Sequence, residues 1–311
     1  MAKEKSPDLA EKRFWENNER FADLFNAFFF NGDPVIDPDL LQERNTDVTA
    51  SIPLGNLYEH VRKYEDVSKI YQGAELSILG IENQTNVHYG MPLRARLYDD
   101  LDMLKESAAL MGIRRAEKGI DKKEWLSGMK KGDRLHLSMR IIVYYGEEPW
   151  DGPRKLSDMV EIPDAFKPYF QDYLMPLVCI NEKSNFERAY KNGSVKNLMT
   201  QLYLVYQKDW DGIRKMDVEL DNDTADVLGA VTGNKVLIQA ASEAKGGIRM
   251  CTALEQLREE GREEGHTEGY NEHQRETIIR MLKADVDVAT IANFNGATIE
   301  MVNQIKKENN L

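Results

Sequence analysis

The sequence has few cysteines, no long apolar run and no surplus of positive charge, and each shortage excludes a class of protein. Its two cysteines, Cys179 and Cys251, form no CxxC pair, which excludes a disulfide framework and a cysteine zinc clip. No stretch approaches the roughly eighteen apolar residues of a membrane-spanning helix, and the N-terminus holds no apolar block of the kind that a secretory signal needs. We therefore expect a cytoplasmic protein with no membrane partner.

The net charge of −12 also limits what the chain binds. Proteins that bind duplex DNA usually carry a basic balance, because their affinity comes largely from neutralising phosphates. A local basic rim can still operate on an acidic protein, and a divalent cation can cancel the carboxylates of an active site. The charge therefore argues against tight non-specific binding and leaves DNA possible as a substrate.

What the sequence does contain is enough apolar material for a core, since 41% of its 311 residues are hydrophobic. Apolar spacing predicts both helices and strands along the chain, which indicates an α/β fold. Leu93, Leu97, Leu101 and Leu104 are expected to form the apolar side of the longest helix. The helices are expected at 11–30, 57–71, 89–116 and 186–208, and the strands at 76–81, 135–145 and 174–180.

A composition shift near residue 250 divides the chain into a predicted domain at 1–250 and a charged helical region at 251–311. Gly261, Gly265 and Gly269 recur every four residues, which would place them on one face of a helix. Two interpretations stay open, a close helix-to-helix contact in a homo-oligomer and a flexible acidic linker. The segment that begins at Thr298 fits either the second helix of a helix-turn-helix or a small helical cap.

The candidate chemistry lies where acidic residues flank strand-like segments. Asp47 begins one β-prone segment, and Glu82 and Gln84 end the next. Alternation along a strand puts Glu82 and Gln84 on one side, with Asn83 opposite. If the two segments pair as neighbours, Asp47 and Glu82 converge on one edge of the sheet. The alternative is a pair of solvated acids at strand ends.

A convergent Asp47 and Glu82 would suit Mg²⁺, with Mn²⁺ as an alternative ion. Magnesium takes one or two carboxylates, keeps several waters and completes its shell with substrate phosphates. Gln84 cannot act as a general base or carry positive charge, but its amide can orient the attacking water or a phosphate oxygen. We therefore expect Asp47 and Glu82 as metal ligands, with Gln84 as the third catalytic residue.

The region from Ile81 to Tyr98 resembles the motif region of the recombination-promoting nuclease and transposase family, which belongs to the PD-(D/E)XK nucleases. The likeness lies in an acid-x-Gln strand end, here Glu82 and Gln84, followed by a helix that bears Arg94 and Tyr98 four residues apart. The segment 142–153, with its Pro-Trp turn, resembles the same family, and so, more loosely, does most of the chain.

The resemblance implies a PD-(D/E)XK core, which is a central mixed sheet flanked by helices, with a C-terminal helical extension. It also implies a metal-dependent DNA endonuclease linked to recombination or mobile elements, in which Arg94 and Tyr98 contact the substrate. Each residue has a plainer alternative: Arg94 pairs with an acid, and Tyr98 is a buried tyrosine with a bonded hydroxyl. The alternative function is an inactive nuclease-like module for binding or assembly through the C-terminal helices.

Overall fold

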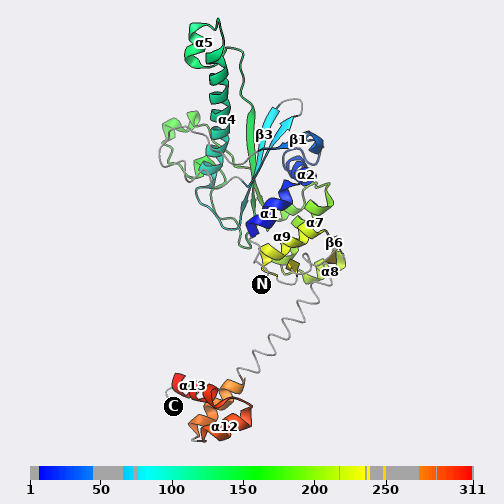
Figure 1. The fold of residues 1–311 in the computed structure, drawn as a ribbon, viewed down its shortest axis with the longest axis vertical. Coiled ribbons are helices and arrows are strands. Elements are labelled where there is room, and N and C mark those ends of the chain that lie inside the picture. The colour runs from blue at the N-terminus through cyan, green and yellow to red at the C-terminus, as the bar shows by residue number, and fades with distance from the viewer. Residues whose placement is uncertain are drawn as a thin grey trace. The chain divides into compact units, whose positions relative to one another are not determined.

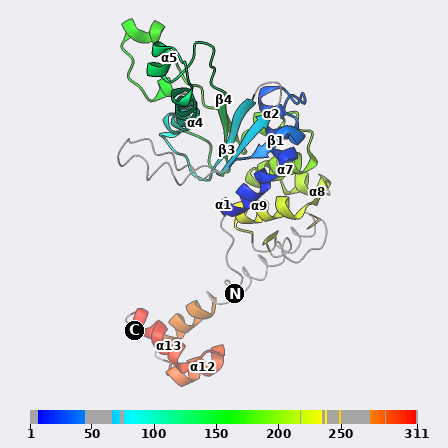
Figure 2. The same cartoon turned by 45° about the horizontal axis from the view of Figure 1, so that its top comes forward.

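The computed structural model describes residues 7–44, 66–72, 76–216, 218–234, 237–238, 248–249, 273–284 and 286–309, and only the backbone at 76–78 and 248. The chain divides into two compact units, Met1–Cys251 and Thr252–Leu311. Figure 1 and Figure 2 show the ribbon of the chain from two directions.

The first unit is built on a mixed sheet, in which the described residues supply five strands in the order β1-β2-β3-β4-β5. β2 runs antiparallel to both of its neighbours, β1 and β3, whereas β4 runs parallel to both β3 and β5. This arrangement confirms the predicted α/β class with a mixed sheet. The strands are β1 (Leu41–Glu43), β2 (Val67–Gln72), β3 (Leu76–Gln84), β4 (Leu137–Tyr144) and β5 (Leu177–Cys179).

Helices cover both faces of this sheet, with α4 on one side and α1 and α2 on the other (Figures 1 and 2). A short second sheet pairs β6 (Glu219–Leu220) with β7 (Ile248–Arg249). The helices of this unit are α1 (Pro7–Glu16), α2 (Asn18–Phe29), α4 (Met91–Ala116), α5 (Lys122–Ser127), α6 (Lys183–Phe186), α7 (Gly193–Tyr206), α8 (Trp210–Met216) and α9 (Asn222–Thr232).

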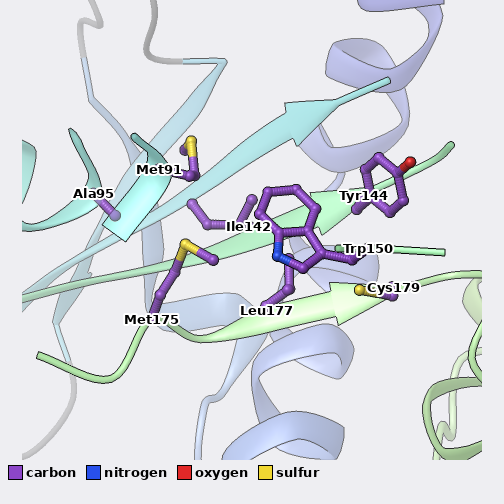
Figure 3. Packing of buried hydrophobic residues seen from close by; sticks show 8 residues of the cluster. All are labelled: Met91, Ala95, Ile142, Tyr144, Trp150, Met175, Leu177 and Cys179. Carbon is purple, nitrogen blue, oxygen red and sulfur yellow. The ribbon is translucent and has the colours of Figure 1, made fainter. Parts of the chain in front are cut away.

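β4 is buried on both of its faces. Towards α4, Ile142 and Tyr144 join an apolar cluster with Met91 and Ala95 of α4 and with Leu177 and Cys179 of β5, closed by Trp150 and Met175 (Figure 3). On the opposite face, the Trp15 indole of α1 donates a hydrogen bond of 2.7 Å to the Tyr145 hydroxyl. Because both faces are covered, the second half of β4, residues 141–144, is a continuous apolar run, as is usual in parallel strands.

Three expectations about local structure are wrong. The predicted helix at 11–30 is two helices, because Asn17 adopts an extended backbone and its side chain accepts the Arg20 N–H as the N-cap of α2. Residues 67–71 form strand β2 rather than the end of a helix, since they pair with both β1 and β3. In α4, Leu93 and Leu104 are exposed, and the buried face carries Met91, Ala95, Tyr98 and Leu101 together with two aspartates.

The second unit is a small helical body with its own core. Residues 273–283 are helical and are followed by α12 (Val288–Asn295) and α13 (Ile299–Glu308). Gly296 ends α12 in the left-handed conformation with a φ of 61°, and the Thr298 side chain accepts the Met301 N–H to begin α13. The core residues are Ile278, Leu282, Ile291, Ala292, Val302 and Ile305.

Within the described parts of the chain, no helix has the length and apolar character that a membrane crossing requires. The glycine-spaced segment that includes Gly261, Gly265 and Gly269 lies outside the described residues. The proposed homo-oligomer contact through that segment therefore stays a prediction.

Candidate functional site

Glu82 lies near the end of β3, and only 1% of its surface is exposed. The Arg94 guanidinium, from the first turn of α4, lies 3.3 Å from its Oε2 atom. Arg94 also donates a hydrogen bond of 2.7 Å to the Tyr98 hydroxyl, one turn further along the helix. The fold therefore brings Glu82, Arg94 and Tyr98 together, on the four-residue spacing noted in the sequence.

Burial and the nearby charge of Glu82 raise the pKa of Tyr98 to about 12, although Arg94 opposes the shift. The Tyr98 hydroxyl therefore stays protonated at neutral pH. It accepts from Arg94 and keeps its own proton to donate, which suits a group that binds an anion better than one that removes protons.

Gln84, two residues after Glu82, is partly buried at the end of β3. Its side-chain amide donates to the backbone carbonyl of Asn83 at 2.7 Å. This hydrogen bond uses one of the two amide protons of Gln84. The carbonyl oxygen and the second proton are the groups that could contact a water or a phosphate oxygen.

Asp66 is the residue that the structure adds to the site. It stands immediately before β2, and the register that sets Val67 opposite Ile81 brings it alongside Glu82 and Asn83. The Asn83 N–H donates to Asp66 Oδ2 at 2.7 Å. Burial raises the pKa of Asp66 to about 6, partly offset by this hydrogen bond and by the positive charge of Arg94. Arg94 is thus an electrostatic neighbour of both Asp66 and Glu82.

A third carboxylate, Glu11 of α1, lies close enough to Asp66 for their charges to interact. Burial, together with the charges of Asp8 and Asp66, raises the pKa of Glu11 to about 8. The residue is 0% exposed, and neither carboxylate oxygen has a hydrogen-bond partner among the described residues. A buried acid of this kind is costly to ionise unless a cation approaches it.

Arg140 of β4 supports Glu82 from the other side. Its Nη1 atom lies 3.8 Å from Glu82 Oε1, while Nε and Nη2 lie 2.9 Å from Asp99 and 3.1 Å from Asp102 of α4. Arg44 also pairs with Asp102, at 2.7 Å. The site therefore sits at one end of a buried ion network that ties the sheet to α4.

The carboxylates at this place can be compared with what the expected metal requires. Among the described residues no group of three or more histidine, cysteine or acidic side chains is arranged to hold an ion. Asp66 and Glu82 occupy facing positions at the end of the β2–β3 pair, and two carboxylates are a number that magnesium accepts when waters and phosphate oxygens complete its shell. The unpartnered carboxylate of Glu11 adds negative charge beside this pair. Their carboxylate oxygens are donors of the kind that a hard divalent cation prefers.

Asp47, the expected partner of Glu82, lies outside the described residues, so its role stays a prediction. The sequence pattern misses Asp66 because residues 57–71 also suit a helix. One signal could have found it: Gly73 separates two β-prone segments of similar length, 67–72 and 76–84. A hairpin between them places the residue before the first strand opposite the end of the second, and that residue is Asp66.

Comparison of the chain with protein-family models, with curated proteins and with solved structures found no match.

Proposed function

We propose that the chain is a divalent-metal-dependent nuclease that hydrolyses phosphodiester bonds of DNA, with a core of the PD-(D/E)XK type. The observation that carries the proposal is the placement of Asp66 beside Glu82 and Asn83 at the open end of the β2–β3 pair. The topology supports it, because a mixed sheet with helices on both faces is what the family resemblance implies.

Asp66 and Glu82 would hold the metal ion, which is expected to be Mg²⁺ or Mn²⁺. A bound divalent cation lowers the pKa of its water and polarises the phosphodiester. A cation at this place would also favour the ionised form of Asp66, whose pKa burial raises to about 6.

The remaining residues would position the substrate phosphate and the attacking water. Arg94 has 19% of its side chain exposed and already stands next to the two carboxylates, so its guanidinium can bind a phosphate oxygen and stabilise the developing negative charge. Tyr98 holds Arg94 in position through its hydroxyl. Gln84 would orient the attacking water, because an amide can hydrogen-bond water but cannot take its proton.

The proposal is tested by incubating the purified chain with supercoiled plasmid and with linear duplex DNA, in Mg²⁺, in Mn²⁺ and in a chelator. We expect nicking that requires the metal. Asp66→Asn and Glu82→Gln should each reduce the rate by at least about 100-fold, because even residues that only support metal ligands typically cost 10–100-fold.

The matched control is Asp164→Asn with Glu161→Gln, which removes the same two charges from exposed positions. This control should cleave like the unmodified chain. Asp47→Ala completes the set and shows whether the other predicted ligand contributes. Metal-dependent cleavage that survives both Asp66→Asn and Glu82→Gln would refute the assignment.

One observation favours a second candidate, a nuclease-like module without activity. Glu82 is paired with Arg94 and lies near Arg140, so its charge is balanced within the protein. In such a module Glu82 would serve the ion network that joins the sheet to α4. No cleavage in any metal, together with a large loss of stability in Glu82→Gln, would favour this candidate.

A further inference from the structure

Positive charge is concentrated in one segment of this acidic chain. Residues 114–134, here called the basic arm, comprise the last turn of α4, the short helix α5 and the loop that leads towards β4. The arm holds eight lysines and arginines against four acids. Its net charge of +4 leaves −16 on the rest of the chain, whose total is −12.

The four acids of the basic arm are all engaged within it. Asp133 accepts two hydrogen bonds from Arg114, of 3.0 and 2.5 Å, and Glu117 pairs with Lys130. Asp121 caps α5 by accepting the Lys123 N–H. Glu124 accepts the Lys131 N–H at 3.2 Å. These acids therefore hold the arm in shape.

Six cations of the arm are exposed, and none forms an ion pair with an acid among the residues that the structure describes. Arg115 instead lies over the Trp125 ring, with 5.8 Å between its guanidinium carbon and the ring centroid. The six cations are Arg115, Lys118, Lys122, Lys123, Lys131 and Arg134. Exposed cations of this kind on an ordered support suit a polyanion.

The arm also lies at a suitable distance from the candidate site. α4 begins at the site, where Arg94 contacts Glu82, and its far end carries α5 beyond the sheet (Figures 1 and 2). At about 1.5 Å per residue, the helix rises about 32 Å from Arg94 to Arg115. One turn of B-form DNA measures about 34–36 Å.

We propose that the basic arm binds the phosphate backbone of duplex DNA, about one helical turn away from the Asp66–Glu82 site. This inference rests on the proposed function, because it names the surface that holds the substrate of that site. An anionic membrane suits the arm less well. The exposed Trp125 and Leu126 could insert into a lipid interface, but α5 has only six residues and offers no extended apolar face.

The test measures binding of the full chain to a labelled duplex of about three helical turns, by fluorescence anisotropy in a chelator, so that cleavage plays no part. The arm variant combines Lys118→Gln, Lys122→Gln, Lys123→Gln and Lys131→Gln. The matched control replaces four exposed lysines elsewhere in the first unit: Lys167→Gln, Lys183→Gln, Lys196→Gln and Lys215→Gln. Circular dichroism verifies that each variant is folded.

We expect the arm variant to bind at least about tenfold more weakly at 0.1 M salt, on the order of the effect that several phosphate contacts produce. The slope of log K against log salt should become shallower by about 0.9 for each phosphate that the arm variant no longer neutralises. The control should stay within about twofold of the unmodified chain, since its lysines lie outside the arm.

Three results would overturn the inference: no binding by the unmodified chain, equally weakened binding in both variants, or an arm variant that binds DNA normally. If the arm variant still binds DNA normally but no longer binds vesicles of phosphatidylserine, the arm is a membrane-binding surface instead. The cleavage assay separates the two proposals. If the arm binds DNA but the chain does not cleave it, only the proposed nuclease activity is refuted. If the chain cleaves DNA but the arm variant binds DNA normally, only the proposed role of the arm is refuted.

Discussion

At the scale of single residues, Arg140 contributes more to the stability of the fold than its neighbours in the sequence suggest. It is 3% exposed, and it bonds to Asp99 and Asp102, two buried aspartates of α4. Its guanidinium also lies over the Tyr98 ring, at 4.9 Å. Removing one member of a buried ion pair leaves an uncompensated charge in a medium that solvates it poorly.

We therefore expect Arg140→Met to lower the free energy of unfolding by about 3–5 kcal/mol. Urea denaturation followed by circular dichroism measures this directly. Arg115→Met is the control, because Arg115 is exposed and should change stability by less than about 0.5 kcal/mol. A small effect of Arg140→Met would mean that the network around Asp99 and Asp102 rearranges without cost.

Glu11 predicts a dependence of stability on pH. Its pKa rises from 4.5 to about 8 on folding, so between these values the folded chain keeps a proton that the unfolded chain has released. The wild-type stability contributed by this group is therefore present below pH 4.5 and is lost as pH rises towards about 8.

Glu11→Gln cannot titrate and should escape that loss. Measured by urea denaturation in a chelator, its advantage over the wild-type chain should be absent near pH 4 and grow towards pH 8. The slope should be at most about 1.4 kcal/mol per pH unit. A constant difference across this range would show that Glu11 ionises normally in the folded chain.

At the scale of elements, α5 depends on the glycine that ends it. Gly128 has a φ of 72°, and a Cβ atom there would lie 2.3 Å from Cγ of Met111 on α4. Gly119 has a similar φ of 80°, but nothing lies within 4 Å of its Cβ position. Both glycines thus have a positive φ, but only at Gly128 would a Cβ atom also clash with a neighbouring side chain.

Gly128→Ala should destabilise the basic arm by more than about 1 kcal/mol, since strain and a clash act together. Gly119→Ala should cost about 1 kcal/mol or less, because only the strain applies. Hydrogen exchange of the α5 amides reports the difference. Equal exchange rates in the two variants would mean that Met111 moves aside freely.

The elements also show which parts of the fold the sequence pattern can predict. β4 is predicted because the segment 135–145 ends in an apolar run, 141–145, that carries β-branched residues. α4 is predicted from its length, but its apolar side is not. Leucine spacing predicts that Leu93 and Leu104 lie on the buried side of the helix. The side that is buried is instead the one that carries the ion-pair partners of Arg140. Such long-range pairs leave no periodic signal in a sequence.

The candidate site is predicted in part for the same reason. Glu82, Arg94 and Tyr98 lie near one another along the chain, and the family resemblance, whose motif has the Arg and Tyr on one side of a helix, brings them together in the prediction. Asp66 depends on β2 pairing with β3, and the residues of 66–72 also suit a helix. The position of Glu11 at the site depends on how α1 packs, which no local sequence pattern predicts.

At the scale of the whole molecule, opposite charges are separated within an acidic chain. Asp66 and Glu82 occupy facing positions at the open end of the β2–β3 pair, and Glu11 lies near Asp66, while the basic arm lies at the far end of α4. This separation suits a polyanionic substrate. The basic arm would hold one part of it, and a cation bound at the carboxylates would contact another. The small unit at 252–311 has its own core and a helix–turn–helix order of elements, and its role in DNA binding stays a prediction.

The most direct measurement is the position of Mn²⁺ in a crystal of the chain, located by anomalous scattering. The account predicts an ion bound by carboxylate oxygens of both Asp66 and Glu82, at roughly 2.0–2.2 Å, and its loss in a crystal of Asp66→Asn. It would be contradicted by crystals grown in saturating Mn²⁺ in which no ion lies between these side chains and Glu82 remains paired with Arg94.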